Sequence, residues 1–335
     1  MNVYEEIFIL LASFSTFLSL LVILTGVIWP GIMLSKSKPF STILFYTSLA
    51  DFCSGIVNCL GFPTSGSEIC NVQAFGTLYF SPASWLWTLM LVYQLRTLII
   101  FKSINLSMRW MHLICWSIPL IPAFLPQTTN SYGQDDSLNG VAPCILGGDS
   151  TTKYIWINTT KTGLAILCFL MMLIWSVEIH LYICKCNGDS GREVSLFNSM
   201  KLYPLILFVT WIPKCVVIML INAKVIGVNQ ILATCVITFS TQYGSLLTIT
   251  YFSRSSVSRL LWFNLLKRIC LKGLGSHSVL ASHLSVMDED ERLIQTEYIE
   301  SHENVLVAQA MEQESNRLRD SLLELRESSV VNIII

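Results

Sequence analysis

Long apolar runs alternate with short polar segments along the first 262 residues, and acidic, polar sequence fills residues 286–330. A helix needs roughly 20 mostly apolar residues to cross the hydrocarbon core of a bilayer. The runs predicted to cross are 7–29, 41–62, 74–101, 110–126, 156–183, 201–222 and 229–252. The pattern therefore predicts an all-α integral membrane protein, whose residues 1–252 form a seven-transmembrane helix bundle.

Two further segments follow the last apolar run. In residues 253–272, leucines and other apolar residues alternate with arginines and lysines. This pattern predicts a short amphipathic juxtamembrane helix that lies along the inner leaflet, where anionic lipid attracts its basic residues. Residues 273–335 are expected to form a cytoplasmic tail, acidic over most of its length and partly helical or disordered. Membrane lipid is thus one predicted partner.

The distribution of basic residues predicts the orientation, because cytoplasmic loops carry an excess of lysine and arginine. With the amino terminus outside, twelve basic residues flank the spans on the inner side and three on the outer side. The inner residues are Lys36, Lys38, Lys102, Arg109, Lys185, Arg192, Lys201, Arg254, Arg259, Lys267, Arg268 and Lys272, and the outer ones are Lys153, Lys161 and Lys224. We expect a multi-pass plasma-membrane protein with an extracellular amino terminus and a cytoplasmic tail.

The cysteines fit this topology. Of eleven cysteines, only Cys70 and Cys144 fall in or beside outer loops. Disulfides persist on the oxidising side of a membrane, so a Cys70–Cys144 bridge is the natural pairing, with two free thiols as the alternative. Cys270, just past a basic stretch, is a candidate for palmitoylation, although an unmodified thiol there is equally compatible. Asn158 begins an outer Asn-Thr-Thr sequon and is a glycosylation candidate.

Composition and motifs narrow the function. The chain is 53% hydrophobic and 13% charged, whereas soluble domains carry about 25% charged residues. It lacks H-E-x-x-H, G-x-S-x-G, a Walker lysine and a G-x-G-x-x-G that opens a helix. It also lacks the paired intramembrane carboxylates and inverted repeats of many transporters. We therefore expect no enzyme and no cofactor, and nothing in the sequence points to a nucleic-acid partner.

Two charged residues lie inside the apolar runs, and their presence there requires a structural or functional explanation. Asp51 lies near the middle of the second run, where a carboxylate must face the bundle interior. It is either a structural polar knot or a cation-sensitive hinge. Arg96 follows Cys70 by 26 residues, or roughly 39 Å of helix, which places it at the cytoplasmic mouth. There it either extends to the interface or forms a latch between the inner helix ends.

The sixth run, LYPLILFVTWIPK at 202–214, combines an aromatic residue, a proline and a lysine. Pro213 removes a helical hydrogen bond and bends the helix, and Trp211 presents a large face beside the bend. Lys214 lies in the outer half of this run. Contact with an anionic or polar ligand is the functional interpretation, and extension to the interface or pairing with a loop carboxylate is the alternative.

Three segments resemble the slime-mould cyclic-AMP receptors, the class E G-protein-coupled receptors, which share features with secretin-like receptors. They are CNVQAFGTLYFSPASWLWTLML (70–91), HLICWSIPLIPAFLP with the following loop to APC (112–144), and LYPLILFVTWIPK (202–214). The resemblance implies a receptor that binds an extracellular small-molecule agonist, for which a cyclic nucleotide is one candidate, and acts on a heterotrimeric G protein. It also implies the Cys70–Cys144 disulfide and a bend at Trp211 and Pro213.

The expected mechanism combines these features. Agonist enters beneath the second outer loop and contacts the outer ends of the helices, with Tyr79, Trp211 and Lys214 as candidate ligand-binding residues. The sixth helix then pivots at Pro213 and opens a cytoplasmic cleft near Arg96. Two rivals are a retinal-type seven-helix protein and a small membrane transporter. The first would need a lysine in the middle of the last span, and residues 229–252 contain none.

Overall fold

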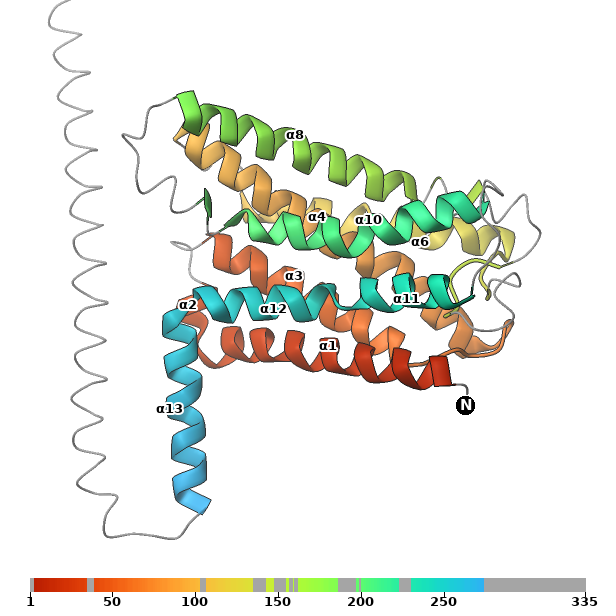
Figure 1. The fold of residues 1–335 in the computed structure, drawn as a ribbon, viewed down its shortest axis with the longest axis horizontal. Coiled ribbons are helices and arrows are strands. Elements are labelled where there is room, and N and C mark those ends of the chain that lie inside the picture. Colours follow the sequence, from red (N-terminus) through yellow and green to blue (C-terminus); the bar gives the residue numbers. More distant parts are fainter. Residues whose placement is uncertain are drawn as a thin grey trace, which may run out of the picture. The chain divides into compact units, whose positions relative to one another are not determined.

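The computed structural model describes residues 3–34, 39–102, 107–134, 143–147, 155, 156, 159, 162–185, 197, 198, 200–222 and 230–273. Within them, the assigned elements are all helical (Figure 1). They are α1 (Val3–Ile28), α2 (Pro30–Met33), α3 (Pro39–Asn58), α4 (Glu68–Phe101), α5 (Met108–Ser117), α6 (Leu120–Phe124), the 3-10 helix η1 (Leu125–Thr129), α8 (Gly163–Lys185), α10 (Leu202–Asn222), α11 (Gln230–Thr241), α12 (Tyr243–Arg254) and α13 (Ser256–Gly273). The all-helical bundle is confirmed.

Helix α4 is the centre of the bundle, and α3, α5, α6, α8 and α10 all pack against it. In its most apolar 18-residue stretch 72% of the residues are buried, compared with 28% for α1 and α8. The Ser67 side chain caps its first turn by accepting a hydrogen bond from the Cys70 amide, which satisfies one of the free amides at a helix start. Trp85 and Trp87 are fully buried in α4. This helix is therefore the buried element against which five other helices pack.

Five described stretches are long and apolar enough to cross a membrane: α1, α3, α4, Met108–Thr129 and α8. Prolines divide the fourth stretch into α5, α6 and η1. Helix α10 contains a shorter apolar stretch, Leu202–Val217. The last predicted span consists of α11 and α12, separated at Gln242. The chain is thus a multi-span membrane protein, and a total of seven spans stays a prediction.

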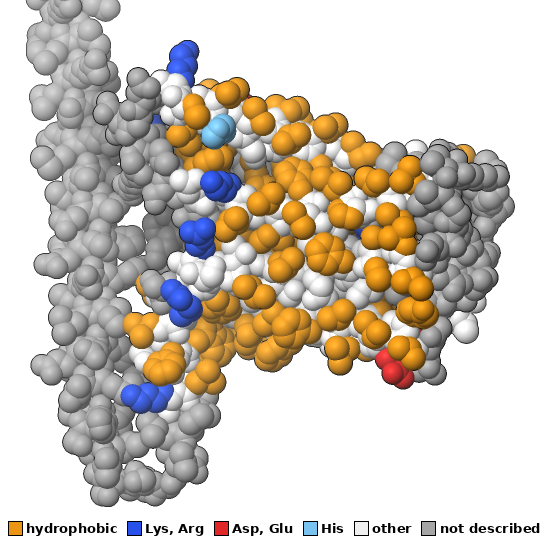
Figure 2. All heavy atoms as spheres, viewed as in Figure 1, with side chains coloured by type: hydrophobic (Ala, Val, Ile, Leu, Met, Phe, Trp, Pro, Cys, Tyr) orange, Lys and Arg blue, Asp and Glu red, His pale blue; other side chains and the backbone are white. Residues whose placement is uncertain are grey.

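On the face shown in Figure 2, hydrophobic side chains cover the middle of the bundle and basic side chains gather at one end. An acidic side chain lies at the opposite end, near the amino terminus in this view. An apolar belt between two polar ends suits a bilayer. The basic end agrees with the predicted cytoplasmic side, although orientation itself stays a prediction. The compact unit that holds the bundle runs to Arg259.

Candidate functional site

A small polar cavity lies among α1, α3, α4, α10, α11 and α12, and Pro143 and Ile145 of the loop around Cys144 also line it. Its volume is about 40 Å³, enough for a few water molecules. The two charged groups that line it are Asp51 and Lys214, and the described remainder is mainly hydroxyl-bearing and aromatic. Buried charges are costly unless they are paired or hydrogen-bonded, so this cavity is the strongest candidate for a functional site.

Lys214 points into the bundle. The residue is only 5% exposed, and its Nζ donates a hydrogen bond to Ser240 Oγ at 2.8 Å. The ammonium also lies 4.5 Å from the centre of the Trp211 ring, within range of a cation–π interaction. These contacts tie α10 to α11 and disagree with the alternative in which the lysine extends to the membrane interface.

Trp211 connects the lysine to the core of the bundle. Its ring meets Trp85 of α4 edge to face, with centroids 4.7 Å apart. Pro213 lies inside α10, which remains helical from Leu202 to Asn222. A proline in a helix removes one backbone hydrogen bond, so α10 lacks one such bond close to these two aromatic rings. The pivot at Pro213 stays a prediction that this location favours.

Asp51 lies where three helices approach closely. A Cβ atom added at Gly244 of α12 would lie 2.6 Å from Ser19 Oγ of α1 and 3.2 Å from Asp51 Cβ of α3. Only glycine permits this approach without displacing a neighbour. The side chains of Asp51 and Ser84 lie close enough to interact with each other, but Asp51 Oδ2 and Ser84 Oγ are buried without a hydrogen bond of normal geometry among the described residues. Both residues line the cavity, so water there can satisfy them.

Tyr79 is not part of this cavity as the structure describes it. Its hydroxyl donates to the backbone oxygen of Trp116 at 3.1 Å, and its ring stacks on Phe75 with centroids 5.9 Å apart. The side chain therefore faces α5 and α6. The structure brings Trp211 and Lys214 together but does not bring Tyr79 to them.

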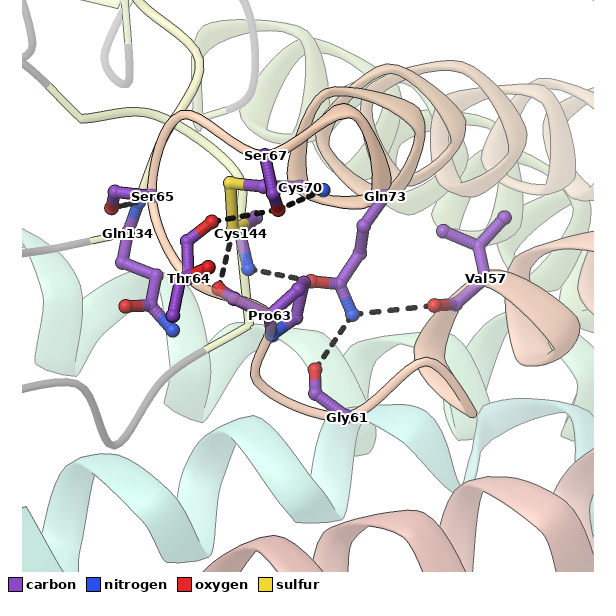
Figure 3. The surroundings of a disulfide bond; sticks show 10 residues. All are labelled: Val57, Gly61, Pro63, Thr64, Ser65, Ser67, Cys70, Gln73, Gln134 and Cys144. Carbon is purple, nitrogen blue, oxygen red and sulfur yellow. Dashed lines mark hydrogen bonds between the residues drawn. A yellow bond between two sulfur atoms is a disulfide. The ribbon is translucent and has the colours of Figure 1, made fainter.

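The predicted Cys70–Cys144 disulfide is present (Figure 3). Beside it, the fully buried Gln73 makes three hydrogen bonds. Its Nε2 donates to the backbone oxygens of Gly61 at 2.8 Å and Val57 at 3.3 Å, and its Oε1 accepts from the Cys144 amide at 2.7 Å. The side-chain amide of Gln73 therefore connects α3 and α4 to the loop whose residues Pro143 and Ile145 line the cavity.

Sequence reasoning gave Gln73 no role, although a signal was available. Residues three apart share a helix face, so Gln73 lies on the same side of α4 as Cys70. A polar residue beside a predicted disulfide, at the start of a span, is well placed to bond a loop backbone. Its partners were out of reach because Gly61 and Cys144 belong to irregular segments.

Replacing Gln73 with leucine should destabilise the outer end of the bundle. The change leaves the Cys144 amide and the Gly61 oxygen buried without this partner, and each such group costs about 1–3 kcal/mol. We expect a clear fall in the thermal unfolding midpoint of the purified protein. Gln127→Leu is the control, because Gln127 is exposed and surface changes usually stay within about 0.5 kcal/mol. Equal midpoints for the two variants would contradict this role.

Tyr132 also fastens the outer loop. Its hydroxyl donates to the backbone oxygen of Ala123, and its ring packs against the disulfide. Burial raises the pKa of Tyr132 to about 12 because the phenolate would lose its hydration. The hydroxyl is therefore protonated at neutral pH and remains a donor.

At the opposite end of the bundle, Arg96 of α4 has a partner that the sequence did not indicate. Its Nε and Nη2 donate to the two carboxylate oxygens of Glu178 on α8, at 2.7 and 2.8 Å. The side chains are 21% and 40% exposed, and exposed pairs contribute only about 0–1 kcal/mol. The ion pair therefore contributes little to the stability of the fold, and breaking it costs little free energy.

The side chains of the two candidate modification sites are not among those that the structure describes. Asn158 is outside the described residues, and Cys270 lies in α13 with its side chain undescribed. Glycosylation of Asn158 and palmitoylation of Cys270 stay predictions.

The known sequences that match this chain are named as cyclic AMP receptors or as receptor-like proteins. The family described as "Slime mold cyclic AMP receptor" matches residues 2–132. Cyclic AMP receptor-like protein A of Dictyostelium discoideum is 29% identical over 184 residues, which cover 52% of this chain and 45% of that protein. Cyclic AMP receptor 1 of the same organism is 24% identical over 246 residues, 68% of this chain and 57% of its own length. The matches thus span about half the length of these relatives.

The fold also has a solved counterpart. Squid rhodopsin superposes with a TM-score of 0.58 at 18% identity, covering 80% of this chain and 86% of its own. The chain is therefore similar in sequence to the cyclic AMP receptors over part of its length, and it has a fold like that of squid rhodopsin. One of these relatives is named as a cyclic AMP receptor and the other as a cyclic AMP receptor-like protein.

Proposed function

We propose that this protein is a G-protein-coupled receptor that binds an extracellular small molecule between α3, α4, α10 and α11 and activates a heterotrimeric G protein at its basic end. The observation that carries the proposal is the buried Lys214, held in a polar cavity beneath a disulfide-tied loop. A bundle needs no buried ammonium for its stability. A charged group kept at that energetic cost marks a site of recognition.

The agonist is an anion of small size. Lys214 already donates to Ser240, and an anionic oxygen would be a stronger acceptor than a neutral hydroxyl. Trp211 offers an aromatic face beside the same ammonium. A cyclic nucleotide combines one negative phosphate with a flat base, and two relatives are named as cyclic AMP receptors or receptor-like proteins. Cyclic nucleotides are therefore the first ligands to test.

The cavity must enlarge to admit such a ligand. Small-molecule sites usually measure about 300–1,000 Å³, far more than the volume of about 40 Å³ here. The cavity in this structure is too narrow for such a ligand, and we call this narrow arrangement the closed state. Trp211 and Lys214 both belong to α10, so a rotation of α10 about Pro213 would widen the cavity and move the basic end of the same helix. An agonist favours the open state only through its higher affinity for that state.

The Arg96–Glu178 pair serves as the cytoplasmic latch in this scheme. Replacing Glu178 with glutamine removes the charge pair, and we expect nucleotide exchange without ligand to rise about two- to five-fold, corresponding to a shift of up to roughly 1 kcal/mol. The measurement is GTPγS binding to G protein mixed with purified receptor. Glu68→Gln, an exposed change at the other end of the bundle, is the control. A basal rate that is identical in all three proteins would rule out the latch.

Ligand-dependent nucleotide exchange tests the function itself. Receptor in lipid nanodiscs, mixed with heterotrimeric G proteins, should accelerate exchange with at least one member of a panel that includes cyclic AMP and cyclic GMP. Purified protein incubated with retinal tests the rival class. A visible absorbance band that disappears in Lys214→Ala would replace the receptor proposal with a retinal protein.

A further inference from the structure

The charges of Lys214 and Asp51 line one cavity in this bundle. Lys214 bonds Ser240 of α11, while Gly244 of α12 packs against Asp51. The printed contacts of the ammonium are with Ser240 and Trp211 rather than with the Asp51 carboxylate, although both charged groups line the same small cavity. Water in that cavity can bridge the two groups.

Three observations show that this space is polar. Asp51 Oδ2, Ser84 Oγ and Thr77 Oγ1 are buried without a hydrogen bond of normal geometry among the described residues, and all three residues line the cavity. Water that occupied the cavity would bond these atoms and link them towards Lys214. Tyr243 is the other titratable group of the described lining, and its hydroxyl is already bonded to Thr88 Oγ1 at 2.7 Å.

We propose that Asp51 is the internal counter-ion of Lys214, joined to it through water, and that an anionic agonist must displace Asp51 from this role. The pair holds α10 to α3 across the cavity in the closed state. An anion that binds Lys214 supplies the negative charge itself and thereby frees α10 to move. The proposal deepens the proposed function, because it assigns the closed state a specific electrostatic restraint.

A double-mutant cycle tests the pair without any ligand or G protein, so its result is independent of receptor activity. Asp51→Asn and Lys214→Gln each leave one buried charge without its counter-ion, and we expect each to lower the thermal unfolding midpoint by roughly 5 °C. The double variant removes both charges. The midpoint of the double variant should lie within about 2 °C of that of the more stable single variant. It should therefore lie well above the midpoint expected if the two losses added.

The matched control combines Lys214→Gln with Glu178→Gln, a carboxylate that pairs with Arg96 instead. These two changes should add. If Asp51→Asn cannot be purified, its level at the cell surface is compared with that of the double variant. We expect a higher surface level for the double variant than for Asp51→Asn.

Two outcomes would overturn the pair. The first is strict additivity of Asp51→Asn and Lys214→Gln. The second is a wild-type midpoint that is higher in sodium chloride than in choline chloride, together with equal midpoints in the two salts for Asp51→Asn. In that case a free cation, and not Lys214, neutralises the carboxylate. Failure of the ligand screen alone would leave the cycle unaffected and would count against the proposed function only.

Discussion

A Cys70→Ser/Cys144→Ser variant is expected to lose most of its surface expression and the largest share of stability of any change considered for this protein. The disulfide closes a loop with a sequence separation of 74 residues, and loop-closure entropy for that length corresponds to roughly 4 kcal/mol. The loop also carries the Cys144 amide that Gln73 holds, and Pro143 and Ile145 that line the cavity. Freeing it disturbs the site as well as the fold.

The measurement is the fraction of protein at the cell surface, together with the unfolding midpoint of the purified material. Cys59→Ser is the matched control, because Cys59 is a free cysteine at the outer end of α3 that already contacts Ser13 Oγ at 3.4 Å. Surface levels that match the wild type in both variants would show that the bridge contributes little.

Replacement of Lys214 by methionine should lower agonist potency about 10- to 100-fold. A hydrogen bond to a charged group is worth about 1.5–3 kcal/mol, and about 1.4 kcal/mol corresponds to a factor of ten. Methionine keeps an unbranched apolar chain beside Trp211, so the change removes mainly the charge. The readout is the concentration of agonist that gives half-maximal nucleotide exchange.

Lys185→Met provides the comparison, since Lys185 is exposed in the last turn of α8. Its potency should equal that of the wild type. A normal response in Lys214→Met at equal surface expression would remove Lys214 from the binding site.

The helices were largely predictable from the sequence because a membrane helix must be apolar along its whole length. The runs at 7–29 and 41–62 correspond closely to α1 and α3. Helix α4 begins six residues before its predicted start at 74, because Ser67 caps a turn that contains polar residues. The fourth and seventh runs were expected to be single helices and are divided, the fourth by prolines and the seventh at Gln242.

The site was only partly predictable. Residues near each other in the sequence, such as Trp211, Pro213 and Lys214, could be grouped by spacing on one helix. Pairs formed between distant helices could not, and Arg96 with Glu178 is the clearest case at a separation of 82 residues. Tyr79 is predicted to bind the ligand, but its position in the third run does not determine which neighbour its side chain faces, and in the structure its hydroxyl donates to Trp116. The Cys70–Cys144 pairing succeeded because topology left one oxidising compartment and two cysteines.

Nucleotide exchange on a heterotrimeric G protein is the most direct test of the central claim. Wild-type, Glu178→Gln and Lys214→Met receptors are reconstituted in lipid nanodiscs and assayed with and without the cyclic-nucleotide panel. We predict ligand-stimulated exchange in the wild type, raised exchange without ligand in Glu178→Gln, and a weakened ligand response in Lys214→Met. Folded, disulfide-bonded protein that accelerates exchange in none of these conditions would contradict the assignment as a G-protein-coupled receptor.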